Sequence, residues 1–447
     1  MLNWLKKFIK SFLPKSWILA SHKLRAVVAC LLYRFPAKKI KVIGVTGTNG
    51  KTTTCHLITS ILEEAGFKVG MATTINFQVG AKKWANTTKM TTLSPFVLQR
   101  LISQMVKAKC DYAVIETTSH AVVQYRVWGI PYDVMVFTNL THEHLDYHKN
   151  FEEYKEVKGR LFEELESSLR KEDTLKSSIV NRDDPNFSYF SQFEADVKLS
   201  YGIIGGDVSA QNIFYKPDGT DLIMTTPKGK ILIKLKIPGR FNIHNALAAA
   251  ATAISQGINL KTIKNGLEKV EGIPGRMEKI DERQDFIVLV DYAHTPDALQ
   301  KIYETLIPIK KGNLIHVFGA CGDRDRTKRP IMGALAGRYA DFVILTNEDP
   351  YTEDPKKIIN EIAKGVPRGR EKGKEAKKEG INFWKILDRR EAIKRGLELA
   401  KKDDIVLITG KGAEQAIVVG DKKIPWDDRK VTRELLKYEL GGERLEH

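Results

Sequence analysis

The chain has 447 residues, 42% of them hydrophobic, which is enough for two or three domains with separate cores. Its four cysteines, at positions 30, 55, 110 and 321, have no C-x-x-C spacing. This excludes a disulfide scaffold and a thiolate zinc site, and it favours a reducing compartment, the cytoplasm. No apolar stretch approaches the roughly 18 residues that a membrane-spanning helix needs. The formal net charge is +17, so the placement of the basic residues matters.

Residues 1–40 form a basic N-terminal extension. Ten Lys or Arg and no Asp or Glu lie in residues 1–41. Apolar side chains repeat within it at helical spacing, namely Trp4, Leu5, Phe8, Ile9, Phe12 and Leu13. The pattern predicts a basic amphipathic helix, which either contacts anionic lipid at the inner face of the membrane or packs on the following domain. The sequence leaves both open.

A strand, a glycine-containing loop and a helix follow. Residues 40–45 are apolar, residues 47–54 read Gly-Thr-Asn-Gly-Lys-Thr-Thr-Thr, and residues 55–65 have a helical pattern. Backbone N–H groups of such a loop surround phosphate oxygens, while Lys51 adds a charge and the Thr52 hydroxyl can ligate Mg²⁺. The loop predicts ATP binding through Gly47, Thr48, Asn49, Gly50, Lys51, Thr52 and Thr53. Val45 stands where the strict motif has its first glycine, so this is a variant loop.

The rest of the chain predicts two α/β domains. Apolar runs at 42–45, 112–115 and 134–137 alternate with helical patterns, which indicates a parallel sheet with crossover helices. From about residue 196 to residue 237, alternating runs separated by turn residues predict attached antiparallel hairpins. A second α/β series has apolar runs at 286–290, 314–318, 342–345 and 405–408. We therefore expect a P-loop ATPase-like central domain over 41–273 and a Rossmann-like C-terminal domain over 274–447.

Several segments line up with one family. They are Val45–Thr54, Met90–Thr92, Glu116–His120, Phe137–His148, Tyr154-x-x-x-Lys158, Phe241-Asn-x-x-Asn245, Asp291–Asp297, Gly322–Asp325 and Gly410–Gly412. From about Lys41 to Leu440 the chain resembles the Mur ligases, which are ATP-dependent amino-acid ligases of peptidoglycan precursor synthesis, and among them the muramyl-tripeptide synthetase (MurE) type. The resemblance implies a monomeric enzyme that activates a carboxylate as an acyl phosphate, which an amine then attacks.

The resemblance also implies a nucleotide and metal site. Catalytic roles fall on Lys51, Glu116, His144 and Lys158. Two Mg²⁺ ions are expected, with ligands from Thr52, Glu116, His144 and Lys158, the lysine being carbamylated so that it becomes an anion. Asn242 and Asn245 resemble adenine contacts, while Arg276, Asp291 and His294 resemble contacts to ribose and phosphates or, alternatively, interdomain hydrogen bonds. His142, His144 and His148 do not have the spacing of a known zinc motif, and Asp146 beside them suits Mg²⁺.

The substrates implied are UDP-MurNAc-L-Ala-D-Glu and a diamino acid. Residues resembling the family's substrate contacts are Thr91, Thr92, Ser119, Arg126, Asp349, Gly410 and Glu414. Family members begin with a uridine-binding domain of about a hundred residues, and only some 40 residues precede the ATP-binding strand in this sequence. Either the basic extension replaces that domain in part, or the central domain alone holds the acceptor, or the acceptor lacks the uridine group.

The added amino acid stays open between lysine and diaminopimelate. Diaminopimelate-adding enzymes carry Asp-Asn-Pro-Arg, whose arginine pairs with the distal carboxylate, and residues 348–351 read Glu-Asp-Pro-Tyr instead. Tyr351 cannot form that ion pair, whereas Glu414 can hold an ammonium group. The sequence therefore predicts an amino acid with a terminal amine, either lysine or diaminopimelate bound differently, with lysine slightly ahead.

Two other functions compete with this reading. One is a folylpolyglutamate-synthetase-like ligase, which shares the loop, and the other is a non-catalytic, membrane-associated ATP-binding protein. The run from Glu116 to His120 favours the muramyl ligase, and intact Lys51, Glu116, His144 and Lys158 argue against loss of catalysis. The basic run at 364–378 is typical of a solvated loop, so we expect no nucleic-acid partner.

Overall fold

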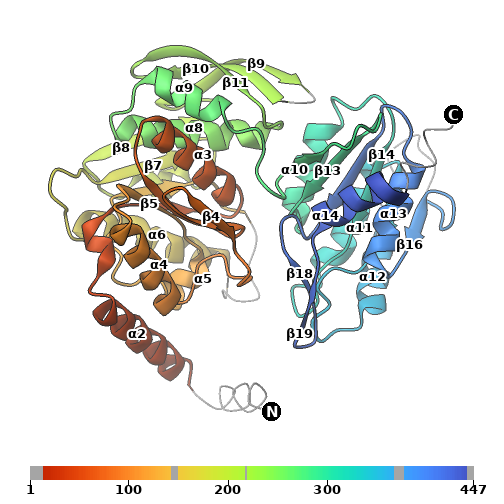
Figure 1. The fold of residues 1–447 in the computed structure, drawn as a ribbon, viewed down its shortest axis with the longest axis horizontal. Helices are drawn as coiled ribbons and strands as arrows, with labels where there is room; N and C mark the ends of the chain where they lie inside the picture. The colour runs from red at the N-terminus through yellow and green to blue at the C-terminus, as the bar shows by residue number, and fades with distance from the viewer. Residues whose placement is uncertain (1–13, 142–149, 217–218, 367–376, 440–447) are drawn as a thin grey trace. The chain divides into compact units, whose positions relative to one another are not determined.

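A computed structural model of the chain describes residues 14–141, 150–216, 219–366 and 377–439 (Figure 1). The chain divides into two compact units. The first comprises Met1–Ile213, Asp221–Lys234 and Asn242–Val270, and the second comprises Phe214–Thr220, Leu235–Phe241 and Glu271–His447. The α/β fold class expected from the sequence is confirmed in both units.

The first unit is built on an eleven-stranded sheet with the order β11-β10-β9-β8-β7-β6-β1-β5-β2-β3-β4. β1 lies in the middle and pairs in parallel with β5 and β6. Parallel strands end at the same edge of a sheet, so this topology gathers the residues that follow β1, β5 and β6. The strands are β1 (Lys41–Thr46), β2 (Val69–Ala72), β3 (Asn76–Val79), β4 (Lys82–Ala85), β5 (Tyr112–Glu116), β6 (Val134–Phe137), β7 (Ser177–Asn181), β8 (Val197–Gly202), β9 (Val208–Lys216), β10 (Gly219–Thr226) and β11 (Gly229–Leu235).

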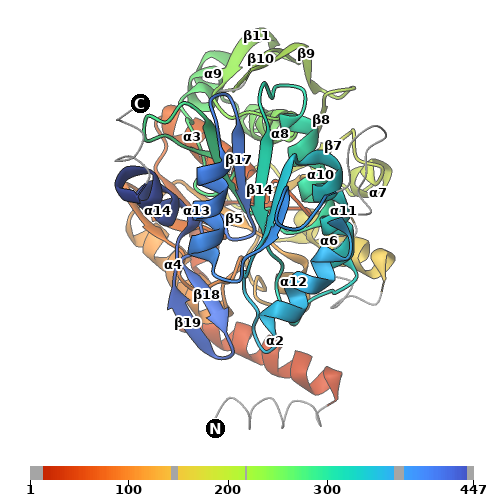
Figure 2. The ribbon, with the colours of Figure 1, turned by 90° about the vertical axis from the view of Figure 1, so that its right-hand side faces the viewer.

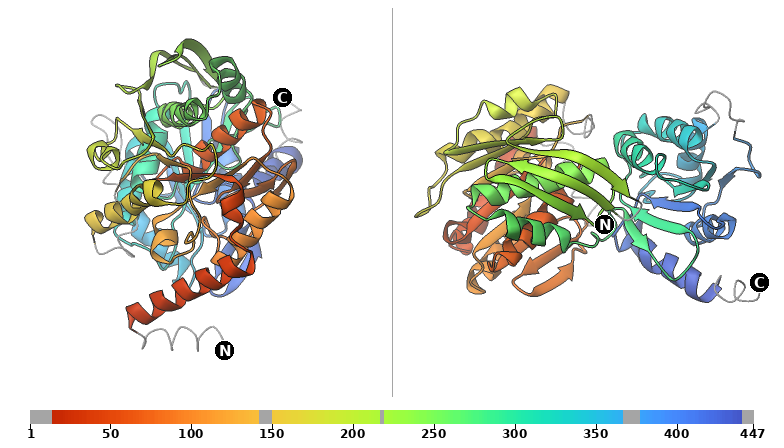
Figure 3. Two further views of the ribbon diagram at one scale, coloured as in Figure 1. Left: turned by 90° about the vertical axis from the view of Figure 1, so that its left-hand side faces the viewer. Right: turned by 90° about the horizontal axis from the view of Figure 1, so that it is seen from above.

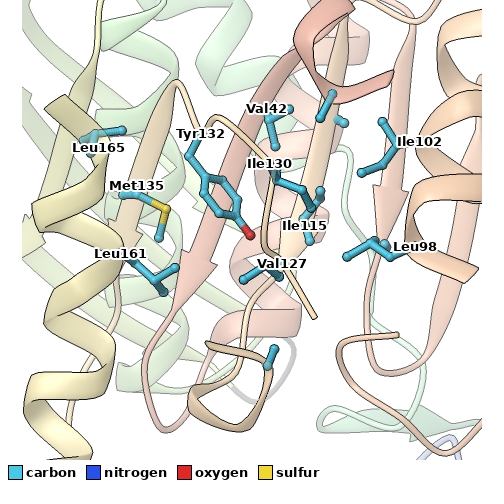
Figure 4. Close-up of a cluster of buried hydrophobic side chains, with 14 of the residues drawn as sticks. Val42, Leu98, Ile102, Ile115, Val127, Ile130, Tyr132, Met135, Leu161 and Leu165 are labelled. Atoms are coloured by element: carbon cyan, nitrogen blue, oxygen red, sulfur yellow. The ribbon is translucent and has the colours of Figure 1, made fainter. Parts of the chain in front are cut away.

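Helices cover this sheet and share a core with it. Figure 4 shows part of that core, where Val42 and Ile115 from the central strands meet Leu98 and Ile102 from α4. All four are almost fully buried, as expected for strands that are covered rather than half exposed. The helices are α2 (Lys15–Leu32), the 3₁₀ helix η1 (Pro36–Lys39), α3 (Lys51–Glu64), α4 (Pro95–Lys107), α5 (Ser119–Val123), α6 (Phe151–Ser167), α7 (Phe187–Ser191), α8 (Arg240–Ser255) and α9 (Leu260–Glu268).

Two features of this sheet differ from the sequence-based expectation. β8, the first strand of the region expected to be antiparallel, pairs in parallel with both β7 and β9. The hairpin of β3 and β4 was not expected, because each strand is only four residues long and lacks a clear alternating pattern. The expected hairpin character is present between β10 and β11, which are neighbours joined by two residues.

The second unit has a six-stranded sheet with the order β12-β13-β17-β14-β15-β16, and a separate two-stranded hairpin. Its central strands are parallel, and they coincide with the four apolar runs of the second predicted series. The strands are β12 (Glu278–Ile280), β13 (Ile287–Asp291), β14 (Leu314–Phe318), β15 (Phe342–Leu345), β16 (Phe383–Lys385), β17 (Ile405–Thr409), β18 (Ala416–Val419) and β19 (Lys422–Pro425). The strands that the sequence did not predict are β12, β16, β18 and β19, which are all short and at edges.

Alternation along these strands builds two cores, one on each face of the sheet. On β17, Leu407 points into one core, and Val406 and Ile408 point into the other. Figure 2 shows α13 and α14 on one side of the sheet and α10 to α12 on the other. The helices are α10 (Pro296–Leu306), α11 (Lys328–Tyr339), α12 (Pro355–Ala363), α13 (Arg389–Leu399) and α14 (Asp428–Glu434), which the π-helical turn η3 (Leu435–Glu439) extends. Because both faces are covered, the central strands are mostly continuous apolar runs rather than alternating ones.

A histidine lies within the apolar run of the central strand β14. His316, on β14, is fully buried and stacks on Phe318 with ring centroids 4.4 Å apart. Its Nδ1 lies 2.7 Å from the Tyr303 hydroxyl and its Nε2 lies 3.0 Å from the Thr409 hydroxyl. Burial, and secondarily the positive charge of Arg389, lowers the pKa of His316 to about 3. The imidazole is therefore a neutral member of the core.

α2 is the helix of the N-terminal extension that the structure describes. Figures 1 and 3 show it reaching past the other helices of the first unit at its N-terminal end. The predicted amphipathic run from Trp4 to Leu13 lies outside the described residues. Within the described ranges, no helix is long and apolar enough to cross a membrane.

Neutral His316 should make the stability of the protein depend on pH. Its pKa in the folded state lies below the ordinary 6.5, so its stabilising effect is complete above about pH 6.5 and is lost as the pH falls toward 3. The wild type should lose about 2 kcal/mol of unfolding free energy between pH 7 and pH 5 through this group, and His316→Gln should lose less. Urea unfolding of both proteins at the two pH values measures the difference. Equal losses would contradict the assignment.

Candidate active site

The predicted phosphate loop joins β1 to α3, and it fits closely against its neighbours. Gly47 has φ +145° and Gly50 has φ +82°, both in the region that favours glycine. A Cβ on Gly47 would lie 1.9 Å from the Thr138 hydroxyl oxygen, and one on Gly50 would lie 2.3 Å from Asn245 Oδ1. Both glycines are therefore required by backbone conformation and by space. Their loop leads directly into the N-terminus of α3 at Lys51.

The segment after β6 holds this loop in shape. The Asn49 N–H donates to Asn139 Oδ1 at 2.9 Å, and Asn139 Nδ2 donates back to the Asn49 carbonyl at 3.0 Å. The Thr138 hydroxyl also donates to that carbonyl, at 2.7 Å, and the Thr48 N–H donates to the Asn139 carbonyl at 2.8 Å. Thr138 and Asn139 lie in the run 137–148 that resembles the family, but no sequence pattern predicted that they hold the loop.

Two lysines converge on one carbonyl oxygen of the loop. Lys51 Nζ donates to the Gly47 carbonyl at 3.1 Å and to the Thr48 carbonyl at 2.6 Å. Lys158 Nζ, from α6, donates to the same Gly47 carbonyl at 2.8 Å. Lys158 is buried, and its ammonium group lies 4.6 Å from the ring centroid of Tyr154, whose hydroxyl is 3.2 Å from the Thr48 hydroxyl. The structure thus brings both predicted catalytic lysines to the phosphate loop.

Glu116 and Thr52 form the next part of the site. Glu116 ends β5 beside Val45 of β1, and the Thr52 hydroxyl donates to Glu116 Oε2 at 2.9 Å. Thr74 holds the carboxylate from the other side through its N–H, at 2.8 Å, and its hydroxyl, at 3.0 Å. Thr53 is buried beside Thr52 at the start of α3. Thr74 was missed from the sequence because it lies in a loop without a motif.

His144, the remaining predicted metal ligand, lies outside the described residues. In the ranges that the structure describes, no group of three or more His, Cys, Asp and Glu side chains could hold a metal ion. Glu116 and Thr52 therefore offer one carboxylate and one hydroxyl. That pair fits Mg²⁺, which is commonly bound by one or two protein oxygens together with substrate phosphates and water.

Residues predicted to bind the acceptor extend outward from Glu116. The Thr74 hydroxyl bonds the Thr91 hydroxyl at 3.1 Å, and the Thr92 hydroxyl donates to the Glu116 carbonyl at 2.9 Å. Arg126 Nη1 donates to the Thr92 carbonyl at 2.9 Å, and its Nε donates to Gln124 at 2.9 Å. Ser119 is buried at the start of α5. Three separated segments of the sequence, around positions 74, 91–92 and 116–126, thus meet at the carboxyl edge of β5.

Asn242 and Asn245 lie on α8 beside the same loop. Asn245 Nδ2 donates to Asn242 Oδ1 at 3.0 Å, and Asn245 Oδ1 accepts from the Thr54 hydroxyl at 3.2 Å. Both side chains are buried. Asn245 is also the residue with which a side chain at position 50 would clash. The predicted adenine contacts are therefore next to the predicted phosphate contacts.

In the second unit, Arg276, Asp291 and His294 gather at the end of β13. Asp291 accepts from the N–H groups of Met277 and Ala293, each at 2.7 Å, and burial raises its pKa. The Arg276 guanidinium lies 4.3 Å from the ring centroid of Tyr292, and His294 Nδ1 lies 2.9 Å from the Tyr292 carbonyl. Asp291 therefore holds the two backbone segments that carry Arg276 and His294.

The residues predicted to contact the amino-acid substrate surround Lys411, a lysine to which the sequence alone assigned no role. Lys411 Nζ donates to Asp349 at 2.8 Å and to Glu414 at 2.5 Å, and it is fully buried. Burial alone would lower the pKa of Lys411, but Glu414, Asp349 and Glu348 together raise it. Glu414, which was expected to hold a substrate ammonium group, and Asp349, an expected substrate contact, thus already bind an ammonium group of the protein itself. Lys411 stands in the quoted Gly410–Gly412 segment, but spacing alone did not show that it would point inward.

Gly410 and Arg389 shape the same region. Gly410 has φ +111°, and a Cβ there would lie 2.7 Å from Glu348 Oε2. Arg389 donates to both oxygens of Asp428, at 2.8 and 2.7 Å, and to the carbonyls of Thr409 and Asn347. Arg389 thereby ties the end of β17 to the segment before Glu348. Its place on α13 is far from any motif, so the sequence contained no signal for this role.

Comparison with known proteins identifies the family to which this chain belongs. The model of the Mur ligase middle domain matches residues 45–253, and that of the Mur ligase glutamate ligase domain matches residues 275–412. The chain belongs to the Mur ligase family. The P-loop, Glu116 and Lys158 of this Mur ligase lie in the first match, and Lys411 lies in the second. Membership makes the protein an ATP-dependent, ADP-forming ligase.

This Mur ligase matches relatives over most of its own length and most of theirs. It is 41% identical to the UDP-N-acetylmuramoyl-L-alanyl-D-glutamate--2,6-diaminopimelate ligase of Geobacillus thermodenitrificans (strain NG80-2), over 93% of this chain and 83% of that protein. It is 40% identical to the UDP-N-acetylmuramyl-tripeptide synthetase of Roseiflexus sp. (strain RS-1), over 93% of this chain and 82% of that protein.

Solved structures support the same fold. A UDP-N-acetylmuramoyl-L-alanyl-D-glutamate--2,6-diaminopimelate ligase matches with a TM-score of 0.61 and 32% identity, over 90% of this chain and 79% of that one. A folylpolyglutamate synthase of Mycobacterium tuberculosis matches with a TM-score of 0.69 but 17% identity, over 87% of this chain and 92% of that one. The latter likeness shows the fold alone.

Removing the Lys411 ammonium group should destabilise the second unit. Lys411→Met would leave Asp349 and Glu414 buried without their counter-charge, which typically costs about 3–5 kcal/mol. Lys401→Met, at an exposed position, should change the unfolding free energy by less than about 0.5 kcal/mol. Urea unfolding of the three proteins measures both effects. Similar stability of the two variants would show that the carboxylates are not charged in the folded protein.

Proposed function

We propose that this Mur ligase joins diaminopimelate to UDP-MurNAc-L-Ala-D-Glu, with ATP as the energy source. The observation that carries the proposal is the convergence of Lys51, Lys158, Thr52 and Glu116 on one phosphate loop. Relatives about 40% identical over most of the chain, such as the Geobacillus enzyme, bear the name of this activity. The folylpolyglutamate synthase alternative rests on a likeness of 17% identity, which does not extend to function.

The reaction proceeds in two steps, each assigned to one part of the site. A carboxylate oxygen of the acceptor attacks the γ-phosphorus of ATP, and the bond to the β-phosphate oxygen breaks, giving an acyl phosphate and ADP. The amine of the amino acid then attacks the acyl carbon, loses a proton and expels phosphate. Phosphoryl transfer needs fixed positive charge more than covalent participation. Lys51 and the backbone N–H groups of the loop supply it.

Thr52 and Glu116 are proposed to hold one Mg²⁺. They supply oxygen ligands, and their separation of 2.9 Å allows one ion to contact both once the shared hydrogen bond opens. The ion would neutralise charge on the β- and γ-phosphates. Thr74 fixes the orientation of the Glu116 carboxylate, so the ligand is positioned before ATP binds.

Lys158 is proposed to carry a carbamate that supports the second Mg²⁺ together with His144. Its ammonium group is buried on the Gly47 carbonyl, beside the Lys51 ammonium group. Carbamylation would replace one of these two neighbouring cations by an anion. Lys51 would then stabilise the carbamate, because opposite charges close together in a buried site attract strongly.

Diaminopimelate is proposed over lysine, which reverses the slight preference drawn from the sequence. That preference relied on Tyr351, which stands where diaminopimelate-adding enzymes have the arginine for the distal carboxylate. Glu414 as the partner of a substrate ammonium group suits both amino acids, because both carry a second amine. In the structure, Glu414 binds Lys411 and lies 3.4 Å from the Tyr292 hydroxyl, so its charge is already compensated. The Glu414–Lys411 pair therefore does not separate the two amino acids, whereas the names of the relatives favour diaminopimelate.

ADP release with a panel of substrates tests the function. With UDP-MurNAc-L-Ala-D-Glu, kcat/KM for diaminopimelate should exceed that for lysine roughly tenfold or more, because one charged contact contributes about that much. A preference for lysine would overturn the choice of amino acid. Release only with a folate and glutamate would overturn the muramyl assignment. A parallel reaction with MurNAc-L-Ala-D-Glu, which lacks the nucleotide, shows whether the uridine group is needed.

Replacing Lys158 tests the carbamate. Lys158→Ala should abolish turnover, and short carboxylic acids should restore part of it by occupying the vacated anionic position. Lys155→Ala is the matched control, since Lys155 lies three residues earlier on α6 and pairs with Glu152 instead of the loop. Turnover of Lys158→Ala near that of Lys155→Ala would refute the role of Lys158.

A further inference from the structure

α2 exposes a row of large apolar side chains, which we call the α2 stripe. Trp17 is 69% exposed, Leu24 64%, Val28 44%, Leu31 62% and Leu32 63%. Trp17, Leu24, Val28 and Leu31 are separated by seven, four and three residues, so they share one face of the helix. Single exposed apolar residues are common on protein surfaces, but a continuous row along four turns marks an interaction site.

The opposite face of α2 is fixed to the first unit. Ala26, Ala29 and Cys30 are buried where α2 packs on α4. The Cys30 thiol also lies 3.4 Å from the Trp128 carbonyl, so the helix is anchored at its C-terminal half. α2 therefore cannot turn over to hide the stripe. Figures 1 and 3 show that its N-terminal half extends beyond the neighbouring helices of the unit.

Basic residues border the stripe on both sides. At about 100° per residue, Lys23 and Arg25 lie roughly 100° on either side of Leu24. Lys38 and Lys39, in the next helical turn, are exposed as well. Residues 1–41 contain no Asp or Glu, so no acidic side chain of this segment compensates these charges. An apolar face bordered by Lys and Arg is the pattern of a helix that lies in a membrane interface.

Charge decides between the occupants of this surface. A second copy of the chain would place Lys23 and Arg25 opposite their own equivalents, and like charges beside a helical interface oppose pairing. An anionic lipid surface instead neutralises these residues while it takes up the apolar side chains. We propose that the α2 stripe binds anionic phospholipid, with Trp17 and Leu24 entering the headgroup region. The ligase thereby docks on the membrane surface without crossing it.

Vesicle flotation with the full-length protein tests this proposal. Binding to vesicles of equal parts phosphatidylglycerol and phosphatidylcholine should exceed binding to phosphatidylcholine alone about tenfold or more, and it should weaken as salt rises. Brominated lipids should quench tryptophan fluorescence in the wild type and quench it less in Trp17→Phe. Trp17 is then the residue that enters the lipid.

Matched variants locate the surface. Leu24→Glu should lower vesicle binding about tenfold. Leu175→Glu makes the same charge change at a leucine that is 59% exposed elsewhere on the first unit, and it should bind like the wild type. The pair Lys23→Gln and Arg25→Gln should weaken binding, whereas the exposed pair Lys401→Gln and Lys402→Gln should not. All of these variants should keep ADP-forming activity in solution, which separates membrane docking from the proposed reaction.

Three results would overturn the proposal. The first is equal binding to the two kinds of vesicle, because the charge argument would then fail. The second is equal vesicle binding by Leu24→Glu and Leu175→Glu, because contact would then lie elsewhere. The third is a dimer of the wild type that Leu24→Glu dissociates, because the stripe would then be occupied by a second copy of the chain.

Discussion

The arrangement of the phosphate loop in the first unit depends on the carbonyl oxygen of Gly47. It accepts hydrogen bonds from the ammonium groups of Lys51 on α3 and Lys158 on α6, two helices that both follow β1 in the sequence. Two cations beside one neutral carbonyl repel each other, and a bound anion would relieve that repulsion. The loop that carries this carbonyl has no room for a Cβ at Gly47 or Gly50. Its shape and its charge therefore serve the same purpose, which is to hold polyphosphate.

The second unit manages buried charge in another way. Its charged groups form closed pairs, with Lys411 between Asp349 and Glu414, and Arg389 on both oxygens of Asp428. Such pairs add little net stability compared with apolar packing, but removal of one partner is costly. They fix the positions of the segments around Gly410 and Asn347. Rigid placement of these segments is what selection of one amino acid over a similar one requires.

α2 combines a structural and a surface role on one helix. Its small residues, Ala26 and Ala29, let it approach α4 closely, and five of its large apolar residues, those of the α2 stripe, face outward. The usual arrangement of an amphipathic helix places the large apolar residues inside. On α2 the large apolar residues of the stripe lie outside instead. An apolar environment outside the protein explains this arrangement better than packing on the first unit alone.

The sequence by itself determined the elements that depend on local pattern. The strands at 314–318 and 342–345 were predicted with the residues that the structure shows, because buried parallel strands are short, continuous apolar runs. The phosphate loop was equally clear, since only glycine suits its backbone at Gly47 and Gly50. Lys158 was recognised through family resemblance, not through any property of the residues around it.

Tertiary structure alone decided which groups meet. Asn139 holds the phosphate loop from a position 90 residues away in the sequence, and Thr74 holds Glu116 from a position 42 residues away. Neither an asparagine nor a threonine in a sequence indicates such a role by itself. The parallel pairing of β8 depended on its neighbours, because a strand's direction is set by the sheet and not by its own sequence. In the sequence, Lys411 is only a lysine between two glycines. The fold alone buries it beside Asp349 and Glu414. Local pattern encodes secondary structure, whereas the partner of a charged or polar side chain is fixed only when distant segments pack together.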